Sequence, residues 1–358
     1  MTPAAYALLN LPALQHNLAR VRECAPSARV MAVIKANAYG HGLKRVAETL
    51  HDADAFAVAR VDEAIRLRQS GLEKRIVVLE GFACSEELHL LLQHRLEAVV
   101  HGAWQLELLD VTQIVGTLPV WLKLDTGMGR LGFSPAELEE VYQQLGRCRN
   151  VARPLHLMTH LANADDLQDS KTRQQLTLFN KAAAACPGPR TAANSAGILA
   201  WPDSHTDWVR PGIMLYGVSP FPERCGRELG VRPVMSLHSR LIAVKSIAAG
   251  DTVGYGGQWM ARRSTLLGVV AIGYGDGYPR QAKTGTPVLV NGVRTPLIGR
   301  VSMDMITIDL QNCPEARPGD SVTLWGEELP VEEIARCADT IPYTLLCGIT
   351  RRVQIVAR

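Results

Sequence analysis

The sequence predicts an α/β protein with an N-terminal (β/α)8 barrel of the TIM type, residues 1–228, and a C-terminal, mostly antiparallel β domain, residues 229–358. Short apolar runs alternate with helical patterns over roughly the first 210 residues, which is typical of parallel strands joined by helical crossovers. Eight such runs occur, and eight parallel strands that close on themselves form a barrel. Beyond about residue 231, strand-like runs are broken by Gly, Pro and Asp instead, as in antiparallel sheets.

The barrel strands are expected wherever an apolar run stands between helical patterns. These runs are residues 30–34, 55–59, 76–79, 98–100, 120–124, 155–159, 191–194 and 208–210. Helical spacing precedes the first run, and it occupies residues 63–69, 85–93, 135–145 and 170–185 between later runs. The same alternation would also build an open, doubly wound sheet, which is the alternative architecture.

The second domain is expected to begin after the change in sequence character between Pro220 and Pro233. Its candidate strands are residues 241–244, 266–272, 287–290, 307–310 and 321–324, and its one helical pattern covers residues 331–338. A chain of 358 residues is long enough for one large domain and one smaller one.

The composition argues against several classes of protein. The net charge is +3 with both signs interspersed, so we expect no nucleic-acid partner. No apolar run is long enough to span a membrane, and no basic-then-apolar leader opens the chain, so a cytoplasmic location is expected. The eight cysteines form no C-x-x-C pair and the histidines no H-x-H or H-E-x-x-H spacing, so we predict neither disulfides nor a metal site.

Lys35 is the residue that says most about function. It follows an apolar strand and opens a polar turn that contains glycines. Partial burial lowers the pKa of a lysine amine and makes it nucleophilic, as a Schiff-base lysine requires. A single lysine at a strand end is more often just solvated. The whole run from residue 32 to 42, Ala-Val-Ile-Lys-Ala-Asn-Ala-Tyr-Gly-His-Gly, closely resembles the pyridoxal-phosphate attachment signature of alanine racemases.

Other polar residues follow the ends of later barrel strands, where the active sites of such barrels lie. They are Arg130 after the fifth strand, His160 after the sixth, Ser195 after the seventh and Arg210 at the eighth. Phosphates usually bind at the loops after strands seven and eight. Ser195 and Gly212 lie there, and glycine permits a close backbone approach.

The resemblance implies a role for each matching residue. Lys35 carries pyridoxal 5'-phosphate, Tyr39, Ser195, Gly212, Ile213 and Tyr343 hold its phosphate, and Arg210 faces its pyridine nitrogen near His160. An arginine there can only donate a hydrogen bond, so it leaves that nitrogen unprotonated. The ring is then a weaker electron sink, which favours racemisation over other pyridoxal chemistry.

The resemblance further implies a two-base reaction that interconverts L- and D-alanine. Lys35 and Tyr255 are the two bases, Arg130 contacts the substrate carboxylate, and Lys123 is carbamylated to orient Arg130. Met303 and Asp304 come from the partner subunit of a homodimer with composite sites, and Asp165, Tyr274 and Arg280 line the channel through which substrate enters. Such an enzyme either supplies D-alanine for peptidoglycan or degrades it.

The resemblance covers essentially the whole chain, with Thr159-His160-Leu161 as a mild departure from the more usual Ser-His-Phe. One alternative is a racemase of broader specificity, for example for serine. Another is a decarboxylase of the same fold type. Such decarboxylases carry a catalytic cysteine motif in the second domain, and the residues around Cys313 and Cys347 do not form that motif. A single-barrel cofactor carrier would lack residues 231–358, and a regulatory protein without activity would have no need of Lys35 and Tyr255.

Overall fold

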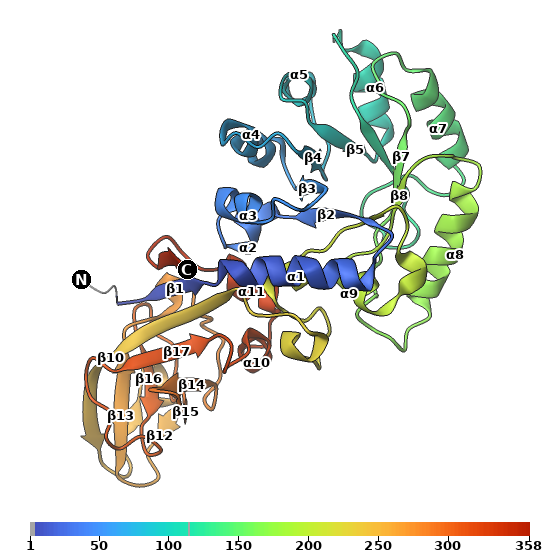
Figure 1. The fold of residues 1–358 in the computed structure, drawn as a ribbon. Helices are drawn as coiled ribbons and strands as arrows, with labels where there is room; N and C mark the ends of the chain where they lie inside the picture. The colour runs from blue at the N-terminus through green and yellow to red at the C-terminus, as the bar shows by residue number, and fades with distance from the viewer. Residues whose placement is uncertain (1–3, 114) are drawn as a thin grey trace.

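The computed structural model describes residues 4–113 and 115–358 and contains a closed, eight-stranded parallel barrel (Figure 1). Its strands are β2 (Arg29–Val33), β3 (Ala55–Val58), β4 (Arg75–Val78), β5 (Glu97–Val100), β6 (Val120–Lys123), β7 (His156–Met158), β8 (Arg190–Thr191) and β9 (Trp208–Val209). Pairing of Val30 with Val209 closes the ring between the first strand and the last. The predicted barrel is therefore confirmed, and the open doubly wound sheet is wrong.

Helices lie around the barrel (Figure 1), and each of them has buried residues. They are α1 (Leu11–Cys24), α3 (Leu43–Thr49), α4 (Val61–Gln69), α5 (Ser85–Gln93), α6 (Ala103–Val111), α7 (Leu138–Arg147), α8 (Lys171–Ala183) and the short α9 (Ser195–Ala200). The Asn10 side chain accepts the amide proton of Ala13 and caps the start of α1, and Leu14 and Leu18 lie on its buried face. Helix α6 was not expected, because its apolar residues show little helical periodicity.

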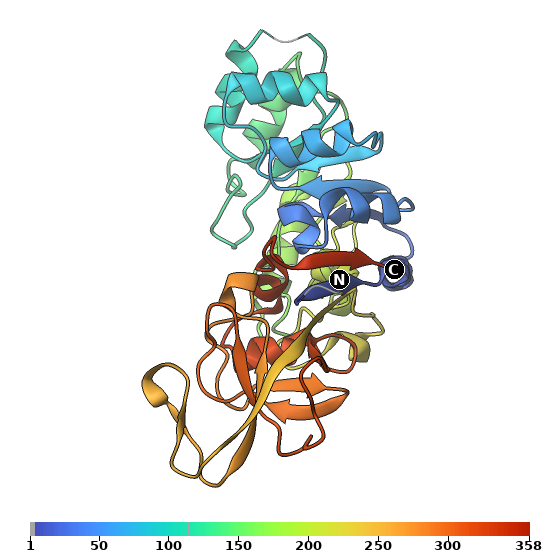
Figure 2. The same ribbon diagram turned by 90° about the vertical axis from the view of Figure 1, so that its left-hand side faces the viewer.

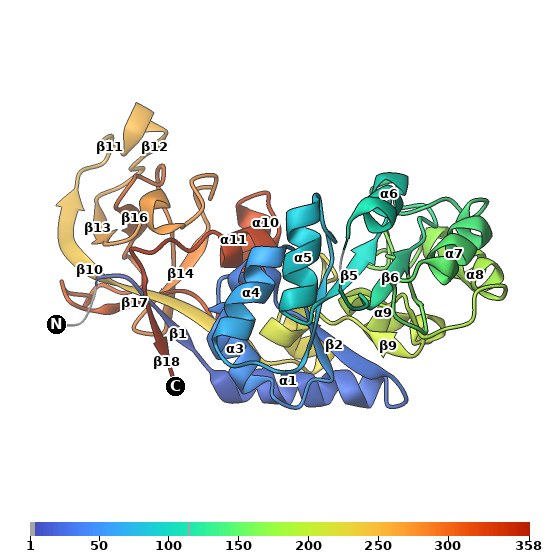
Figure 3. The same cartoon turned by 90° about the horizontal axis from the view of Figure 1, so that it is seen from above.

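The C-terminal domain is built on a mostly antiparallel sheet in the order β15-β14-β17-β10-β1-β18, and β13 and β16 continue it from β10. Its strands are β10 (Met235–Ile247), β13 (Thr265–Val270), β14 (Pro287–Val290), β15 (Val293–Pro296), β16 (Ile306–Asp309), β17 (Ser321–Trp325) and β18 (Gln354–Ala357). The hairpin of β11 (Thr252–Val253) and β12 (Trp259–Met260) projects from this domain (Figures 2 and 3).

The N-terminal strand β1 (Tyr6–Leu9) lies in the C-terminal sheet and not in the barrel, although the sequence-based division had given residues 1–228 to the barrel. It pairs antiparallel with β10 and parallel with β18. Helices α10 (Val331–Cys337) and α11 (Pro342–Cys347) lie between that sheet and the barrel (Figure 3). One continuous hydrophobic cluster runs through both domains.

Within the described part of the chain, no helix is both long enough and apolar enough to cross a membrane.

Candidate active site

A cavity of about 950 Å³ lies where the carboxyl ends of the barrel strands face α10 and α11. Most of the residues singled out in the sequence line it. These are Lys35, Tyr39, Lys123, Arg130, His160, Asp165, Ser195, Arg210, Gly212, Ile213 and Tyr343. The barrel topology thus brings together side chains that lie up to about 300 residues apart in the chain.

Lys35 opens an unusual turn, α2 (Lys35–Tyr39), whose next four residues adopt left-handed dihedral angles. The φ angles of the residues from Ala36 to Tyr39 are 52–54°, although none of the four is glycine. Left-handed backbone costs about 1–2 kcal/mol per such residue, so the surrounding structure must hold the turn in place. The turn directs Lys35 and Tyr39 toward the same cavity.

Two buried side chains hold this turn: Glu63, which lies outside the attachment signature, and His41, a residue of that signature with no predicted role. The Glu63 carboxylate accepts the amide proton of Ala36 at 2.7 Å and that of Ala59 at 2.9 Å. His41 Nδ1–H donates to the carbonyls of Ala38 and Tyr39. Complete burial lowers the pKa of His41 to about 4, so the ring is neutral and Nδ1 can serve as the donor.

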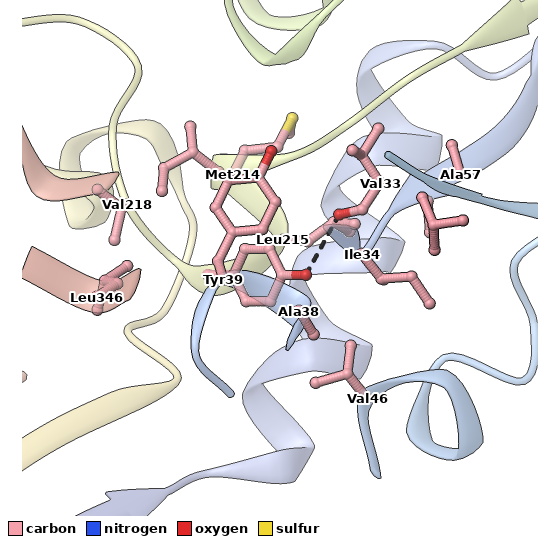
Figure 4. Packing of buried hydrophobic residues seen from close by; sticks show 14 of the residues in the cluster. Val33, Ile34, Ala38, Tyr39, Val46, Ala57, Met214, Leu215, Val218 and Leu346 are labelled. Atoms are coloured by element: carbon pink, nitrogen blue, oxygen red, sulfur yellow. Dashed lines mark hydrogen bonds between the residues drawn. The ribbon is translucent and has the colours of Figure 1, made fainter. Parts of the chain in front are cut away.

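Tyr39 is packed firmly at the end of the turn. Its ring lies 4.7 Å from the ring of Tyr216 and 5.9 Å from that of Tyr343. The Tyr216 hydroxyl donates to the Val33 carbonyl, the hydrogen bond that is dashed in Figure 4. A Cβ added to Gly212 would lie 2.6 Å from the Tyr39 hydroxyl oxygen. The hydroxyl therefore reaches into the loop after β9 only because residue 212 is glycine.

Several basic side chains line the cavity. Burial and the Arg130 guanidinium lower the pKa of Lys35, and burial and Arg210 lower the pKa of Lys123 to about 8. Each effect favours the neutral amine, which is the nucleophilic form. Crowded positive charge also favours anionic ligands such as a phosphate or a carboxylate.

Arg210 is buried, and polar groups surround its guanidinium. It donates to the carbonyls of Thr159 at 2.7 Å and Ala192 at 3.2 Å, and to the Thr191 hydroxyl at 2.5 Å. Desolvation lowers its pKa to about 10, so it remains protonated at neutral pH. A fourth donation, at 3.3 Å, reaches His160 Nδ1.

His160 is neutral, because burial and the neighbouring Arg210 hold its pKa well below the usual range. Since the Arg210 guanidinium can only donate, His160 Nδ1 must be the acceptor of their contact. The ring proton then sits on Nε2. The His160 side chain is thus a neutral donor at the wall of the cavity.

The start of α9 and the loop after β9 form a polar corner of the cavity. Ser195 Oγ accepts the amide protons of Gly212 at 2.9 Å and Met214 at 3.3 Å, which leaves its own proton free to donate. The hydroxyls of Tyr39 and Tyr343 are further donors, and burial raises the pKa of both. This set of donors suits a phosphate group.

The family model "Alanine racemase, N-terminal domain" matches residues 9–220, and "Alanine racemase, C-terminal domain" matches residues 234–357. The chain belongs to the alanine racemase family.

Individual relatives agree along the whole chain. The alanine racemase of Aeromonas hydrophila is 52% identical over 98% of each chain, and that of Shewanella baltica is 53% identical over 99% of each chain. The crystal structure of the biosynthetic alanine racemase from Pseudomonas aeruginosa superposes with a TM-score of 0.97 at 46% identity, covering all of both chains. Function therefore follows the family: the chain is a pyridoxal-phosphate-dependent racemase acting on alanine, not a decarboxylase.

The cavity fits the family's cofactor. A structure of the Bartonella henselae alanine racemase with covalently bound pyridoxal phosphate matches with a TM-score of 0.90 at 30% identity, covering all of both chains. In the present chain, a lysine with a lowered pKa and a corner of phosphate donors line one cavity. When bound, the cofactor supplies the electron sink for breaking the bond from the α-carbon to hydrogen.

Five of the sequence-predicted site residues do not line this cavity. Tyr255, Tyr274, Arg280, Met303 and Asp304 belong to the C-terminal domain. Amides of residues 274 and 275 donate to carbonyls of residues 302 and 303, and Asp304 pairs with Arg352. The Tyr255 and Met303 side chains are 69% and 53% exposed. The structure thus separates them from Lys35 within one chain.

Two further residues of the cavity, Cys347 and Glu332, are not predicted from the sequence. Burial raises the pKa of the Cys347 thiol, and the charge of Lys35 opposes that effect. Glu332, on α10, accepts the amide protons of Ser219 and Gly226 at 2.9 Å each and so ties the C-terminal domain to the last barrel loop. Neither Cys347 nor Glu332 belongs to a motif in the sequence, so their place in the site could not be predicted. Only the packing of α10 and α11 against the barrel brings them to the cavity.

Proposed function

We propose that Lys35 and Tyr255 are the two proton-transfer groups of alanine racemisation, Lys35 for the D-face of the α-carbon and Tyr255 for the L-face. The observation that carries this proposal is the state of the Lys35 amine. Burial and the charge of Arg130 lower its pKa, and it lies in a cavity at the barrel mouth that is lined by several basic side chains. A neutral amine can accept a proton, and a pKa nearer to neutrality makes it a better acid and base.

The remaining cavity residues bind and orient. Ser195, Tyr39, Tyr343 and the backbone at Gly212 and Ile213 hold the cofactor phosphate. Arg210, which stays protonated, faces the pyridine nitrogen as a donor, and His160, which also lines the cavity, accepts a hydrogen bond from it. Arg130 binds the substrate carboxylate, and Asp165 stands where substrate enters.

The working unit of this proposal is a homodimer in which the C-terminal domain of one chain completes the cavity of the other. Support comes from Tyr255, which is exposed on its turn and lies outside its own chain's cavity. Met303 and Asp304 would add substrate contacts, and Tyr274 and Arg280 would extend the channel. A two-fold dimer then has two equivalent composite sites.

Subunit exchange tests this architecture. Lys35→Ala and Tyr255→Phe homodimers should each be nearly inactive, since loss of one base costs about 10² to 10⁴ in rate. Random exchange should restore about a quarter of all sites, because each heterodimer regains one intact site. A mixture that stays inactive although heterodimers have formed would place Lys35 and Tyr255 in one chain. Borohydride should fix the cofactor to the peptide that contains Lys35, and label on another lysine would contradict that role.

Lys123 is carbamylated in this proposal. Its buried amine has a pKa lowered to about 8, so a neutral fraction is available at neutral pH to add carbon dioxide with loss of one proton. The resulting anion would orient Arg130, whereas a second cation would repel it. Native mass spectrometry should find one carbon dioxide in excess of the sequence mass. Unmodified protein that is active without bicarbonate would contradict a required carbamate.

Substrate range and location complete the proposal. Alanine is the preferred substrate, and racemisation rates on a panel of small amino acids that includes serine would measure how strict that preference is. All eight cysteines are unpaired, which suits the reducing cytoplasm where we place the enzyme.

A further inference from the structure

We propose that Gln175 is a positioning residue that locks the Arg130 loop, residues 125–132, to the His160 loop, residues 159–165. The inference rests on the function proposed for Arg130 and His160. Gln175 lies on α8, a helix outside the barrel, yet its side chain is completely buried. Glutamine is seldom fully buried, so its amide must be satisfied by specific partners.

The Gln175 amide contacts both loops at once. Its Nε2 donates to the His160 carbonyl at 3.0 Å and to Thr126 Oγ1 at 3.2 Å. Its Oε1 accepts the amide proton of Ala162 at 2.8 Å. A carbonyl only accepts and an amide N–H only donates, so these partners determine which end of the Gln175 amide is nitrogen.

The hydrogen bonds continue in one direction from the helix to the barrel. Thr159 Oγ1 donates its single proton to the Leu124 carbonyl at 3.0 Å. Its 2.8 Å contact with Thr126 Oγ1 must therefore use the Thr126 proton, and Thr126 is left to accept from Gln175. Each hydroxyl in this series of hydrogen bonds donates once, so loss of Gln175 removes the first donor of the series.

Hydrogen bonds within the Arg130 loop hold its first half and its base together. The Asp125 carboxylate accepts the amide protons of Gly127, Met128 and Gly129. Backbone hydrogen bonds between Phe133 and the strand end close the base of the loop. Gln175 ties this loop to the His160 loop, where the Thr159 carbonyl also accepts from Arg210 at 2.7 Å. The Gln175 amide and the hydrogen bond between Thr126 and Thr159 thus together set the placement of Arg130 relative to Arg210 and His160.

A matched control lies one turn away on the same helix. Thr172 is also completely buried, but within the described residues its hydroxyl has no hydrogen-bond partner. Thr172→Val changes a buried polar residue of α8 without removing a hydrogen bond to either loop. Gln175→Met keeps the length of the side chain and removes all three hydrogen bonds.

The experiment compares these two variants as holoenzymes. For Gln175→Met we expect faster hydrogen exchange at Ala162 and across residues 126–130, and a fall in kcat/KM of about 10²-fold, since a shift of about 1 Å in a positioned group costs that much. Thr172→Val should change neither. Arg130→Ala should lower kcat/KM by a smaller factor in the Gln175→Met background than in the unmodified enzyme, because Arg130 is then already misplaced.

A pH profile separates positioning from a general loss of stability. At neutral pH the carboxylate of Gln175→Glu cannot donate to the His160 carbonyl, whereas the protonated acid can. Its activity relative to Thr172→Val should therefore rise as the pH is lowered. If Gln175→Met does not fold, Thr126→Val removes the next link of the chain and is judged by the same measures.

Two results would overturn the proposal. One is that hydrogen exchange in the two loops is unchanged in Gln175→Met, and the other is that Arg130→Ala lowers kcat/KM by the same factor with and without Gln175→Met. Failure of the proposed function looks different. If Arg130→Ala leaves kcat/KM unchanged in the unmodified enzyme, the role proposed for Arg130 is wrong, and the exchange rates alone then decide whether Gln175 holds the loops together.

Discussion

Gly212→Ala is a single added methyl group whose effect can be worked out from the structure. The new Cβ would lie 2.6 Å from the Tyr39 hydroxyl oxygen and 3.4 Å from its ring carbon Cζ. An ordinary contact begins at 3.4 Å, so the hydroxyl must retreat by roughly an ångström. The rings of Tyr216 and Tyr343 leave Tyr39 little room to turn. Overpacking of this kind costs about 1–3 kcal/mol of stability.

The same retreat should weaken cofactor binding. Loss of one hydrogen bond to a charged group removes about 1.5–3 kcal/mol, so the Kd for pyridoxal phosphate should rise about 10- to 150-fold. Urea unfolding of the apoprotein measures the stability, and fluorescence titration measures the Kd. Both should be repeated in a Tyr39→Phe background.

Tyr39→Phe is the control, because it removes the atom that clashes and leaves the ring carbon at 3.4 Å. Gly212→Ala should then destabilise the protein less than it does with Tyr39 present, and the difference isolates the contact. If Gly212→Ala costs the same stability in both backgrounds, the close approach of the Tyr39 hydroxyl is not what requires glycine at residue 212.

Three further predictions concern buried titratable groups. Burial and Arg210 lower the pKa of Lys123 from 10.5 to about 8, so between these pH values Lys123 is protonated in the unfolded chain but neutral in the folded one. Without bicarbonate, the free energy of unfolding should therefore rise by about 3 kcal/mol from pH 8 to 10.5. Urea unfolding of Lys123→Met should lack that rise. Burial lowers the pKa of His41 from 6.5 to about 4, so stability should fall by about 3 kcal/mol as the pH drops through that window, and an equally steep fall in His41→Asn would rule this out. The Glu63 charge raises the pKa of Lys35 against the larger effect of burial, so Glu63→Gln should lower it further; competitive labelling of the Lys35 amine in the apoprotein across pH measures this, and an unchanged profile would show that Glu63 acts only on the backbone.

The strands of the barrel and the identity of the reactive lysine could be predicted from the sequence because both signals are local. A strand buried on both faces is an unbroken apolar run, as residues 30–34 are, and its burial follows from its own side chains. The residues around Lys35 form a contiguous motif that needs no tertiary information. Arg130, His160, Ser195 and Arg210 were predictable for a related reason: once a barrel is assumed, every strand end faces the same rim.

Partners that come from distant segments could not be predicted in this way. An apolar run shows that a strand is buried but not which sheet it joins. The pairing of β1 with β10 and β18 of the other domain is an example of what such a run cannot show. The left-handed turn after Lys35 is intrinsically unfavourable in a run without glycine. It forms because Glu63 and His41, from its surroundings, satisfy its backbone groups.

Local patterns in the sequence thus suffice to predict the family, the barrel and most of the residues that line the cavity. The folded arrangement of the chain selects which buried polar groups satisfy one another, as Gln175 does for two loops. It also decided that Tyr255 lies outside the cavity of its own chain. The physical reason is that apolar burial can be read from one segment, whereas a hydrogen bond or a composite site depends on where two segments meet.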